Sequence, residues 1–229
     1  MFTINKNSID AFRFEINTVF STIKALPWFI DYSVLSQRQQ KFFNHAEKTI
    51  DYTFEMLQRL ICGIEWESGL KSIRKDFITI NYITDAACHL LVQEYPDIYE
   101  QTSFNSFVDI DKPAYLLDSA NLPIAFYEII KNGILFNISK NKCVQTTIFY
   151  ENNNLIFDFK DNGIGIDREN WKNIFFLMQV FPKNKKSSKG AGIGLTIAKS
   201  IITAHGGNVF VLKSKIGENT VIRVVIPGF

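Results

Sequence analysis

The chain has 229 residues, of which 46% are hydrophobic, and a formal net charge of +2. This length fits one large or two small domains, and the balanced charge argues against a nucleic-acid or anionic-membrane partner. The cysteines Cys62, Cys88 and Cys143 lie far apart and match no metal-ligand spacing, so we expect reduced thiols in a cytoplasmic protein.

The first predicted element is a long amphipathic helix. Its apolar residues recur in alternating gaps of three and four, which is a heptad stripe: Ile9, Phe12, Ile16, Val19, Ile23, Leu26 and Ile30. We expect Ser8 to cap the start of this helix and Pro27 to kink it. Residues 31–36 are polar enough to form a turn.

A second stripe follows that turn, and it predicts a second long helix: Phe43, Ala46, Ile50, Phe54, Leu57, Ile61 and Ile64. Two such helices with a short connection form an antiparallel hairpin. One hairpin cannot bury both stripes, so we expect a homodimer in which two hairpins form a four-helix bundle. Residues 1–66 are the predicted dimerisation hairpin.

Residues 67–229 have a mixed pattern and form the second predicted domain. A helix is expected near residues 84–93 and a longer one over residues 119–136. Two strands, at residues 146–150 and 155–159, are separated by an Asn-rich hairpin turn. A helix over residues 192–205 ends at Gly206, and strands at 208–212 and 221–226 close the domain. No run is long and apolar enough to span a bilayer, so we expect no membrane segment in this chain.

Three short segments carry the chemistry. They read Glu-Ile-Ile-Lys-Asn at residues 128–132, Lys-Asp-Asn-Gly-Ile-Gly-Ile at 160–166, and Lys-Gly-Ala-Gly-Ile-Gly-Leu at 189–195. An Asp followed by two glycines can bind a purine edge while the backbone bends closely around it. A Gly-rich turn that leads into a helix presents backbone N–H groups to phosphates.

In this order and spacing the segments resemble the N, G1 and G2 boxes of the GHKL (Bergerat) fold of sensor histidine kinases, gyrase, Hsp90 and MutL. The chain as a whole resembles a sensor histidine kinase core and is similar to the cores of quorum-sensing hybrid kinases. The mitochondrial-type dehydrogenase kinases are the alternative within the family. The resemblance implies an α+β fold, with a helical hairpin followed by an α/β-sandwich ATP-binding domain.

The resemblance also implies roles for individual residues. Asn132 would ligate a Mg²⁺ ion that bridges the phosphates of ATP, and Asp161 would accept a hydrogen bond from the adenine amino group. Glu128 would orient a water or act as a general base, unless it is a solvated helix residue. Thr220 would support Asp161 through a water, and Gly163 and Gly165 would shape the adenine wall.

The phosphates would face the second Gly-rich turn, formed by Gly190, Gly192 and Gly194. Lys189, with Lys185 and Lys186, could reach the phosphates from a lid, although such a charge run could equally be a solvated face. His205 lies in a structural helix end that is common in this family, so no catalytic role is expected for it.

The phosphoacceptor histidine of the family has no counterpart here. The first helix matches the acceptor motif in Glu15, Asn17 and Thr18, but Phe14 occupies the histidine position. In the heptad, residue 14 falls at the most exposed position. A phenyl ring has no nucleophilic nitrogen, so the usual autophosphorylation is excluded at this position.

Several functions are compatible with this pattern. The protein could dephosphorylate a response regulator through Thr18, or it could be a pseudokinase that docks a response regulator receiver domain or a partner histidine kinase. An engineered His-to-Phe change, an acceptor at His45, and a GHKL ATPase that uses Glu128 are the further alternatives.

Overall fold

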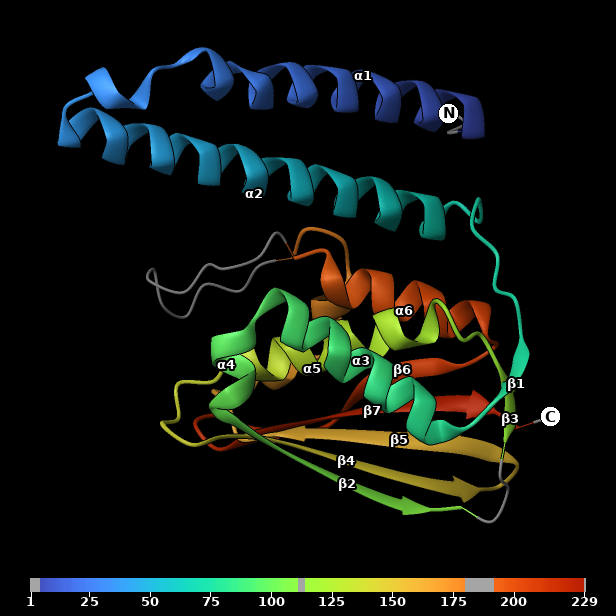
Figure 1. The fold of residues 1–229 in the computed structure, drawn as a ribbon. Coiled ribbons are helices and arrows are strands. Elements are labelled where there is room, and N and C mark those ends of the chain that lie inside the picture. The colour runs from blue at the N-terminus through green and yellow to red at the C-terminus, as the bar shows by residue number, and fades with distance from the viewer. Residues whose placement is uncertain (1–4, 111–113, 180–191, 229) are drawn as a thin grey trace. The chain divides into compact units, whose positions relative to one another are not determined.

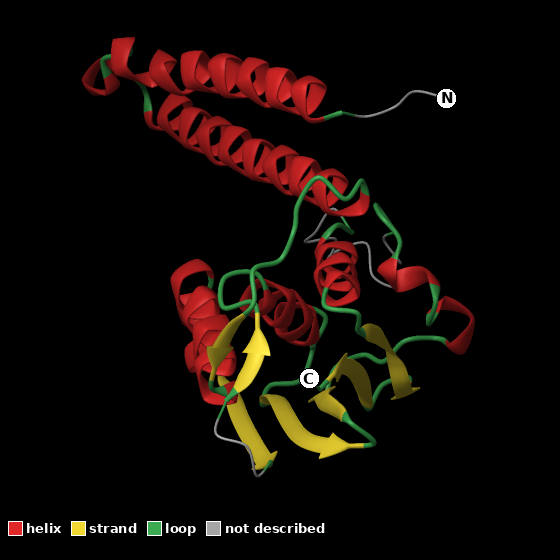
Figure 2. Cartoon of the chain, turned by 90° about the vertical axis from the view of Figure 1, so that its right-hand side faces the viewer, coloured by secondary structure: helices red, strands yellow, loops and turns green. Residues whose placement is uncertain are grey.

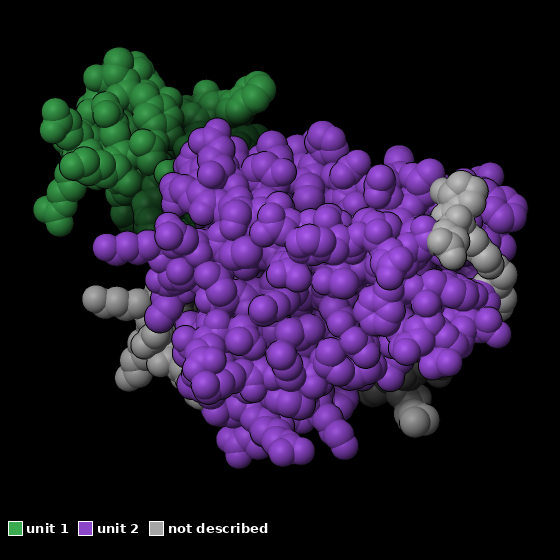
Figure 3. Space-filling model, turned by 90° about the horizontal axis from the view of Figure 1, so that it is seen from below, with its two compact units in different colours: residues 1–71 green, residues 72–229 purple. Residues whose placement is uncertain are grey.

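The computed structural model describes residues 5–110, 114–179 and 192–228. The chain divides into two compact units, Met1–Lys71 and Ser72–Phe229, which are coloured separately in Figure 3. The boundary expected from the sequence, after residue 66, lies a few residues earlier. No helix in the described ranges is both long and apolar enough to cross a membrane. The three cysteines are free thiols.

The first unit is a hairpin of two long helices, α1 (Lys6–Ala25) and α2 (Gln37–Glu67) (Figure 1). Two 3-10 turns, Leu26–Phe29 and Tyr32–Val34, connect them. The second helix begins with a capping box, in which Ser36 and Gln39 satisfy each other's backbone N–H groups.

Two local expectations for α1 were wrong. The cap is Asn5 and not Ser8, because the side-chain oxygen of Asn5 accepts from the backbone N–H of Ser8 at 2.9 Å. Pro27 does not kink the α-helix, because α1 has already ended at Ala25 and Pro27 lies in the following 3-10 turn. A proline fits the first turn of a helical segment, where its missing N–H is not needed.

The apolar stripe of α1 is divided in two. Ile9 and Ile16 are buried with Ile61 of α2 in the core of the hairpin. The exposed fractions of Phe12, Val19 and Leu26 are 49%, 54% and 56%. In the hairpin alone, α2 therefore covers one edge of the stripe and leaves the other edge open.

The second unit contains a five-stranded mixed sheet in the order β2-β4-β5-β7-β6. Its strands are β2 (Thr102–Asp109), β4 (Lys142–Glu151), β5 (Asn154–Asp161), β6 (Asn208–Lys215) and β7 (Asn219–Pro227). The first pair, β2 and β4, is parallel and the other pairs are antiparallel. A small separate pair is formed by β1 (Asp76–Ile78) and β3 (Tyr115–Leu117).

Helices cover one face of the large sheet (Figures 1 and 2). They are α3 (Ile80–Glu94), α4 (Pro96–Glu100), α5 (Leu122–Leu135) and α6 (Gly194–Ala204). Phe126 of α5 anchors this layer, since its ring lies 4.6 and 4.9 Å from the rings of Phe157 and Phe159 on β5. The α+β class and the hairpin-plus-sandwich architecture expected from the sequence are thus confirmed.

Candidate nucleotide site

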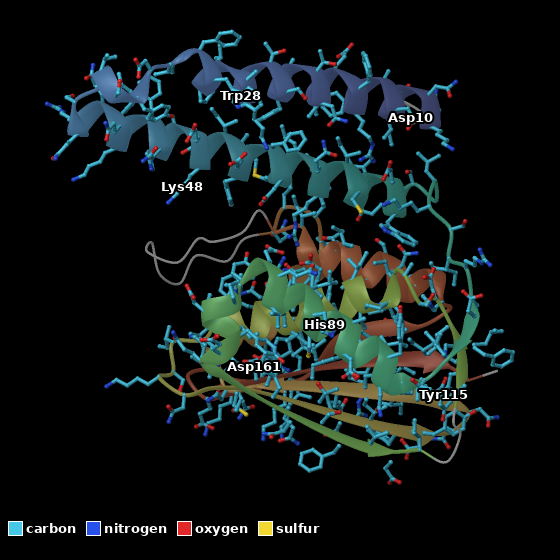
Figure 4. All side chains as sticks on the ribbon, in the orientation of Figure 1. Asp10, Trp28, Lys48, His89, Tyr115 and Asp161 are labelled. Atoms are coloured by element: carbon cyan, nitrogen blue, oxygen red, sulfur yellow. The ribbon has the colours of Figure 1, made fainter. Side chains whose placement is uncertain are left out.

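Asp161 is the last residue of β5 and lies between the sheet and the helical layer (Figure 4). Its Oδ1 atom accepts a hydrogen bond from the backbone N–H of Gly163 at 2.8 Å. Burial raises the pKa of Asp161 from 3.8 to about 6, and backbone hydrogen bonds from Gly163 and Thr220 partly oppose this shift. The carboxylate is therefore ionised at neutral pH but titrates close to it.

Two glycines enclose the Asp161 carboxylate. A Cβ at Gly163 would lie 2.7 Å from Asp161 Oδ1 and 3.0 Å from the carbonyl oxygen of Phe136. A Cβ at Gly133, on α5, would lie 2.9 Å from the Cβ of Asp161. Since real side chains do not approach so closely, both glycines are needed for the helix of the N box to pack against Asp161.

Gly165 is required for a different reason. Its φ is +73°, and a Cβ there would lie 2.4 Å from the carbonyl oxygen of Lys215. The G1 loop consequently turns sharply against the end of β6. Its first bend is held by the N–H of Ile164, which donates to the carbonyl of Phe136 at 3.1 Å.

Thr220 lies directly opposite Asp161 in the register of β5 and β7. It is buried, and its hydroxyl lies 3.0 Å from the hydroxyl of Ser214. The Ser214 hydroxyl also accepts from the N–H of Ile166 at 2.8 Å. Sequence reasoning missed Ser214, because only the sheet register brings it between Thr220 and the G1 loop.

The N box lies on α5, where Asn132 is half-buried and Glu128 is buried. The Glu128 carboxylate forms an ion pair with Lys131 at 3.0 Å, and Lys131 also donates to the Tyr127 hydroxyl at 3.2 Å. Tyr127 in turn donates to Glu94 on α3. Glu128 is therefore part of a buried polar cluster, and the alternative of a solvated helix residue is wrong.

The second Gly-rich turn leads into α6. Gly192 has a φ of +67°, and Gly194 begins the helix. Ile193 precedes it as the cap residue, and the Ile193 side chain makes no hydrogen bond to the first-turn N–H groups. Lys185, Lys186, Lys189 and Gly190 lie outside the described residues.

His205 ends α6 and is buried. Its Nδ1 lies 2.8 Å from the carbonyl oxygen of Ile201, and its Nε2 accepts from the N–H of Asp118 at 3.2 Å. These contacts assign a neutral ring with the proton on Nδ1. Burial lowers the pKa of His205, in keeping with that neutral form.

The residue at the acceptor position is displayed on the outside of α1. Phe14 is 71% exposed, as the heptad predicts. Its neighbours orient the helix, because Arg13 donates to Gln58 of α2 at 3.1 Å and Gln58 donates to Asn17 at 2.8 Å. Thr18 donates its hydroxyl to the carbonyl of Phe14 at 2.9 Å.

The other residues named around the acceptor are also on the surface of the hairpin. Glu15, on α1, is exposed beside Phe14, and His45 is exposed on α2. Among the described residues, no group of three or more His, Cys, Asp and Glu side chains could hold a metal ion.

Comparison with known proteins agrees with this geometry. Residues 118–228 match the family of histidine kinase-, DNA gyrase B- and HSP90-like ATPases. The phytochrome-like protein Cph1 of Synechocystis is 34% identical over 115 residues, which are 50% of this chain and 15% of Cph1. Hybrid signal transduction histidine kinase B of Dictyostelium discoideum is 23% identical over 219 residues, 93% of this chain and 11% of that protein.

Solved structures extend the likeness to both units. The full-length ShkA structure in complex with AMPPNP has a TM-score of 0.81 at 16% identity, covering 98% of this chain and 46% of that one. The histidine kinase ThkA, solved with the response regulator protein TrrA, has a TM-score of 0.61 at 15% identity, covering 98% and 62%. The chain spans less than a third of the length of Cph1 or the Dictyostelium kinase. Residues 118–228 thus belong to the histidine kinase-, gyrase B- and HSP90-like ATPases, and the chain as a whole has the fold of histidine kinase structures, with a helical hairpin followed by an α+β domain.

Proposed function

We propose that the second unit binds ATP with Mg²⁺, with the adenine on Asp161 and the phosphates toward the N-terminus of α6. The observation that carries this proposal is the half-buried Asp161 carboxylate, which lies against Gly133 and Gly163 and opposite Thr220 in the sheet register. An ionised carboxylate accepts only, so it matches the amino group of adenine and repels the carbonyl of guanine.

Asn132 would hold the metal through its amide oxygen. Mg²⁺ prefers hard oxygen ligands and is usually bound by one or two protein groups together with phosphate oxygens and waters. A single Asn side chain near the phosphates fits that coordination pattern, and the bound metal would neutralise phosphate charge. The N–H groups at the start of α6, with Gly192 and Gly194, would contact the phosphates.

Calorimetry tests this proposal directly. The protein is titrated with ATP and with GTP, each with Mg²⁺ and with a chelator. We expect ATP to bind more tightly than GTP, and Mg²⁺ to strengthen ATP binding. Equal affinity for the two nucleotides would contradict the assignment of Asp161.

For the hairpin we propose that autophosphorylation at the usual position is lost. The family reaction needs a nucleophilic imidazole, and residue 14 presents a phenyl ring to solvent. The protein would then act on, or dock, a response regulator receiver domain or a partner histidine kinase in the cytoplasm. The ThkA structure, solved with a response regulator protein, makes a receiver domain the favoured partner.

Two activities remain within that proposal. Thr18 lies one turn after Phe14 on an exposed surface, so its hydroxyl could position a water for removal of phosphate from a receiver aspartate. Alternatively, the hairpin only docks the receiver. Incubating the wild type and the Thr18→Ala variant with a phosphorylated receiver separates the two, because only a phosphatase loses activity with Thr18.

The competing enzyme functions have less support. In the GHKL ATPase alternative Glu128 would activate a water, but its carboxylate is already paired with Lys131 at 3.0 Å. In the His45 alternative the acceptor would lie on α2, without the adjacent Glu of the family motif. In the alternative of an engineered change, the original protein would carry a histidine at position 14 and would be an active kinase.

We also propose that the hairpin forms a homodimer. The open edge of the α1 stripe, formed by Phe12, Val19 and Leu26, is about half exposed in a single hairpin. Covering these side chains with the same edge of a second hairpin would form a four-helix bundle and remove apolar surface from water.

A further inference from the structure

We propose that Asn162 is a positioning residue that fixes the Asp161 carboxylate and thereby sets the preference of the site for adenine. This inference rests on the proposed nucleotide site. Asn162 stands between Asp161 and Gly163 in the G1 box, at a position to which neither the sequence motif nor the comparisons assign a role.

Both the oxygen and the nitrogen of the Asn162 side-chain amide form hydrogen bonds. Its Oδ1 accepts from the Asn137 side chain at 2.6 Å and from the backbone N–H of Cys143 at 2.8 Å. Its Nδ2 donates to the carbonyl of Asn141 at 2.9 Å. The backbone N–H of Asn162 also donates to the carbonyl of Cys143 at 3.4 Å. The residue after Asp161 is therefore tied to the segment between α5 and β4 and to the start of β4.

Asn137 continues this connection toward the N box. It is buried, and its Oδ1 accepts from the N–H of Ser139 at 2.9 Å. Its own N–H donates to the carbonyl of Ile134, in the last turn of α5. The pair Asn137–Asn162 thus joins the end of the helix that carries Asn132 to the loop that follows Asp161.

This connection controls Asp161 because the carboxylate takes a hydrogen bond from that same loop. The N–H of Gly163 holds Asp161 Oδ1 at 2.8 Å, so a shift of the loop moves this donor. The surroundings of Asp161 are closely packed, since a Cβ added at Gly133 or Gly163 would lie 2.9 or 2.7 Å from an Asp161 atom. Releasing Asn162 should allow the carboxylate to turn away from the adenine amino group.

A purely structural role for Asn162 makes a different prediction. It would lower the thermal stability of the domain and weaken all nucleotides alike, without changing the choice between them. The ratio of affinities for ATP and inosine triphosphate separates the two roles. At its 6-position inosine carries a carbonyl oxygen where adenine carries the amino group, so only ATP can donate to Asp161 from that position.

The test measures both affinities by calorimetry for wild type, Asn162→Ala, Asn137→Asp, Asp161→Ala and the double variant Asp161→Ala/Asn162→Ala. Asn137→Asp keeps the acceptor for Ser139 and loses the donor to Asn162, so it serves if Asn162→Ala does not fold. Asn141→Ala is the matched control, because this exposed side chain is removed while the carbonyl that Asn162 uses is kept.

We expect Asn162→Ala and Asn137→Asp to lower the ATP-to-inosine-triphosphate ratio by about 3- to 10-fold, as for loss of one oriented hydrogen bond. Asn141→Ala should leave the ratio unchanged, and Asn162→Ala should change nothing further in the Asp161→Ala background. Two results would overturn the proposal. One is an unchanged affinity ratio in Asn162→Ala, and the other is an equally large change of the ratio when Asn162→Ala is added to the Asp161→Ala variant. A wild type that binds neither nucleotide would overturn the proposed nucleotide site itself, and this inference with it.

Discussion

The proposed nucleotide site and the acceptor position differ in how many parts of the chain form them. The site around Asp161 is built from several segments of the second unit, because the N box helix and the G1 loop pack against this residue and β7 lies opposite it in the sheet. The acceptor position on α1 depends on one side chain, that of Phe14, which is 71% exposed.

This difference would explain how the proposed loss of autophosphorylation is compatible with the proposed retention of nucleotide binding. A pocket that also packs the domain is constrained by folding, since most changes at Gly133, Asp161 or Gly163 would disturb close contacts. An exposed residue carries almost no such constraint, so histidine and phenylalanine are equally compatible with α1. The hairpin can therefore keep its shape and lose its nucleophile.

The sharpest test of this comparison is to restore the nucleophile. We expect Phe14→His to produce acid-labile, base-stable phosphohistidine with radiolabelled ATP, whereas the wild type produces none. Glu15 already follows the acceptor position, and the nucleotide pocket is proposed to be intact. The yield should be partial, because Val19 stands where the family has a proline.

Phe14→Asn is the matched control for this experiment, since it is polar but not nucleophilic and should remain unlabelled. Labelling of the wild type on histidine would break the comparison. His45→Ala would then show whether α2 supplies the acceptor. No label in Phe14→His, despite normal ATP binding, would place a second defect in the hairpin.

The next largest effect is expected on dimerisation. Val19→Asp combined with Leu26→Asp should weaken the dimer by more than about 100-fold, because in each protomer both charges would be buried in the apolar interface between the hairpins. Both residues are more than half exposed in one hairpin, so the hairpin itself should fold. Ser21→Asp, on an exposed position of the same helix, is the control. Light scattering that shows a monomeric wild type would contradict the proposed bundle.

Much of the fold could be predicted from local patterns. Both apolar stripes mark real helices, and the Asn-rich turn lies between β4 and β5, where Asn152 and Asn153 have φ values of 50° and 60°. Long-range pairing could not be predicted. Nothing in the sequence of residues 102–109 shows that they pair in parallel with β4, because parallel strands need no turn between them.

The candidate site shows the same limit. The glycines and Asp161 form a local motif, so their positions follow from the sequence alone. The partners Lys131, Ser214 and Asn137 were missed, because each is polar and unremarkable until packing brings it to Glu128, Thr220 or Asn162. The division of the α1 stripe, with Ile16 buried and Val19 exposed, likewise depends on how α2 lies against α1.

A smaller effect is expected at the adenine end. Asp161→Ala should weaken ATP by about 10- to 100-fold, because a hydrogen bond to a charged group contributes about 1.5–3 kcal/mol. Calorimetry measures the change, and inosine triphosphate, which lacks the 6-amino donor, should be affected much less. An equal loss for both nucleotides would mean that the variant has lost the pocket and not one contact.

The smallest predicted effect is a dependence of ATP affinity on pH. The pKa of Asp161 is about 6. Protonation removes the negative charge of the carboxyl group and occupies one of its two oxygens, so the ionised form is the better acceptor for the adenine amino group. At about pH 5 roughly one carboxyl in ten is ionised, so ATP affinity should fall by about tenfold from its value near pH 8. Asp161→Asn has nothing to titrate there, so it corrects for protonation of the nucleotide's own phosphates.

The same variant tests whether the ionised Asp161 carboxylate lowers the stability of the folded domain. Folding raises the pKa of Asp161 above 3.8, so the folded domain holds this proton more tightly than the unfolded chain. Stability from this group is therefore highest below about pH 4 and is lost as the pH rises through about 6. Asp161→Asn should accordingly raise the melting temperature more at pH 8 than at pH 4, while losing the preference for ATP. A variant that is less stable than the wild type at pH 8 would show that the carboxylate serves the fold as well as the ligand.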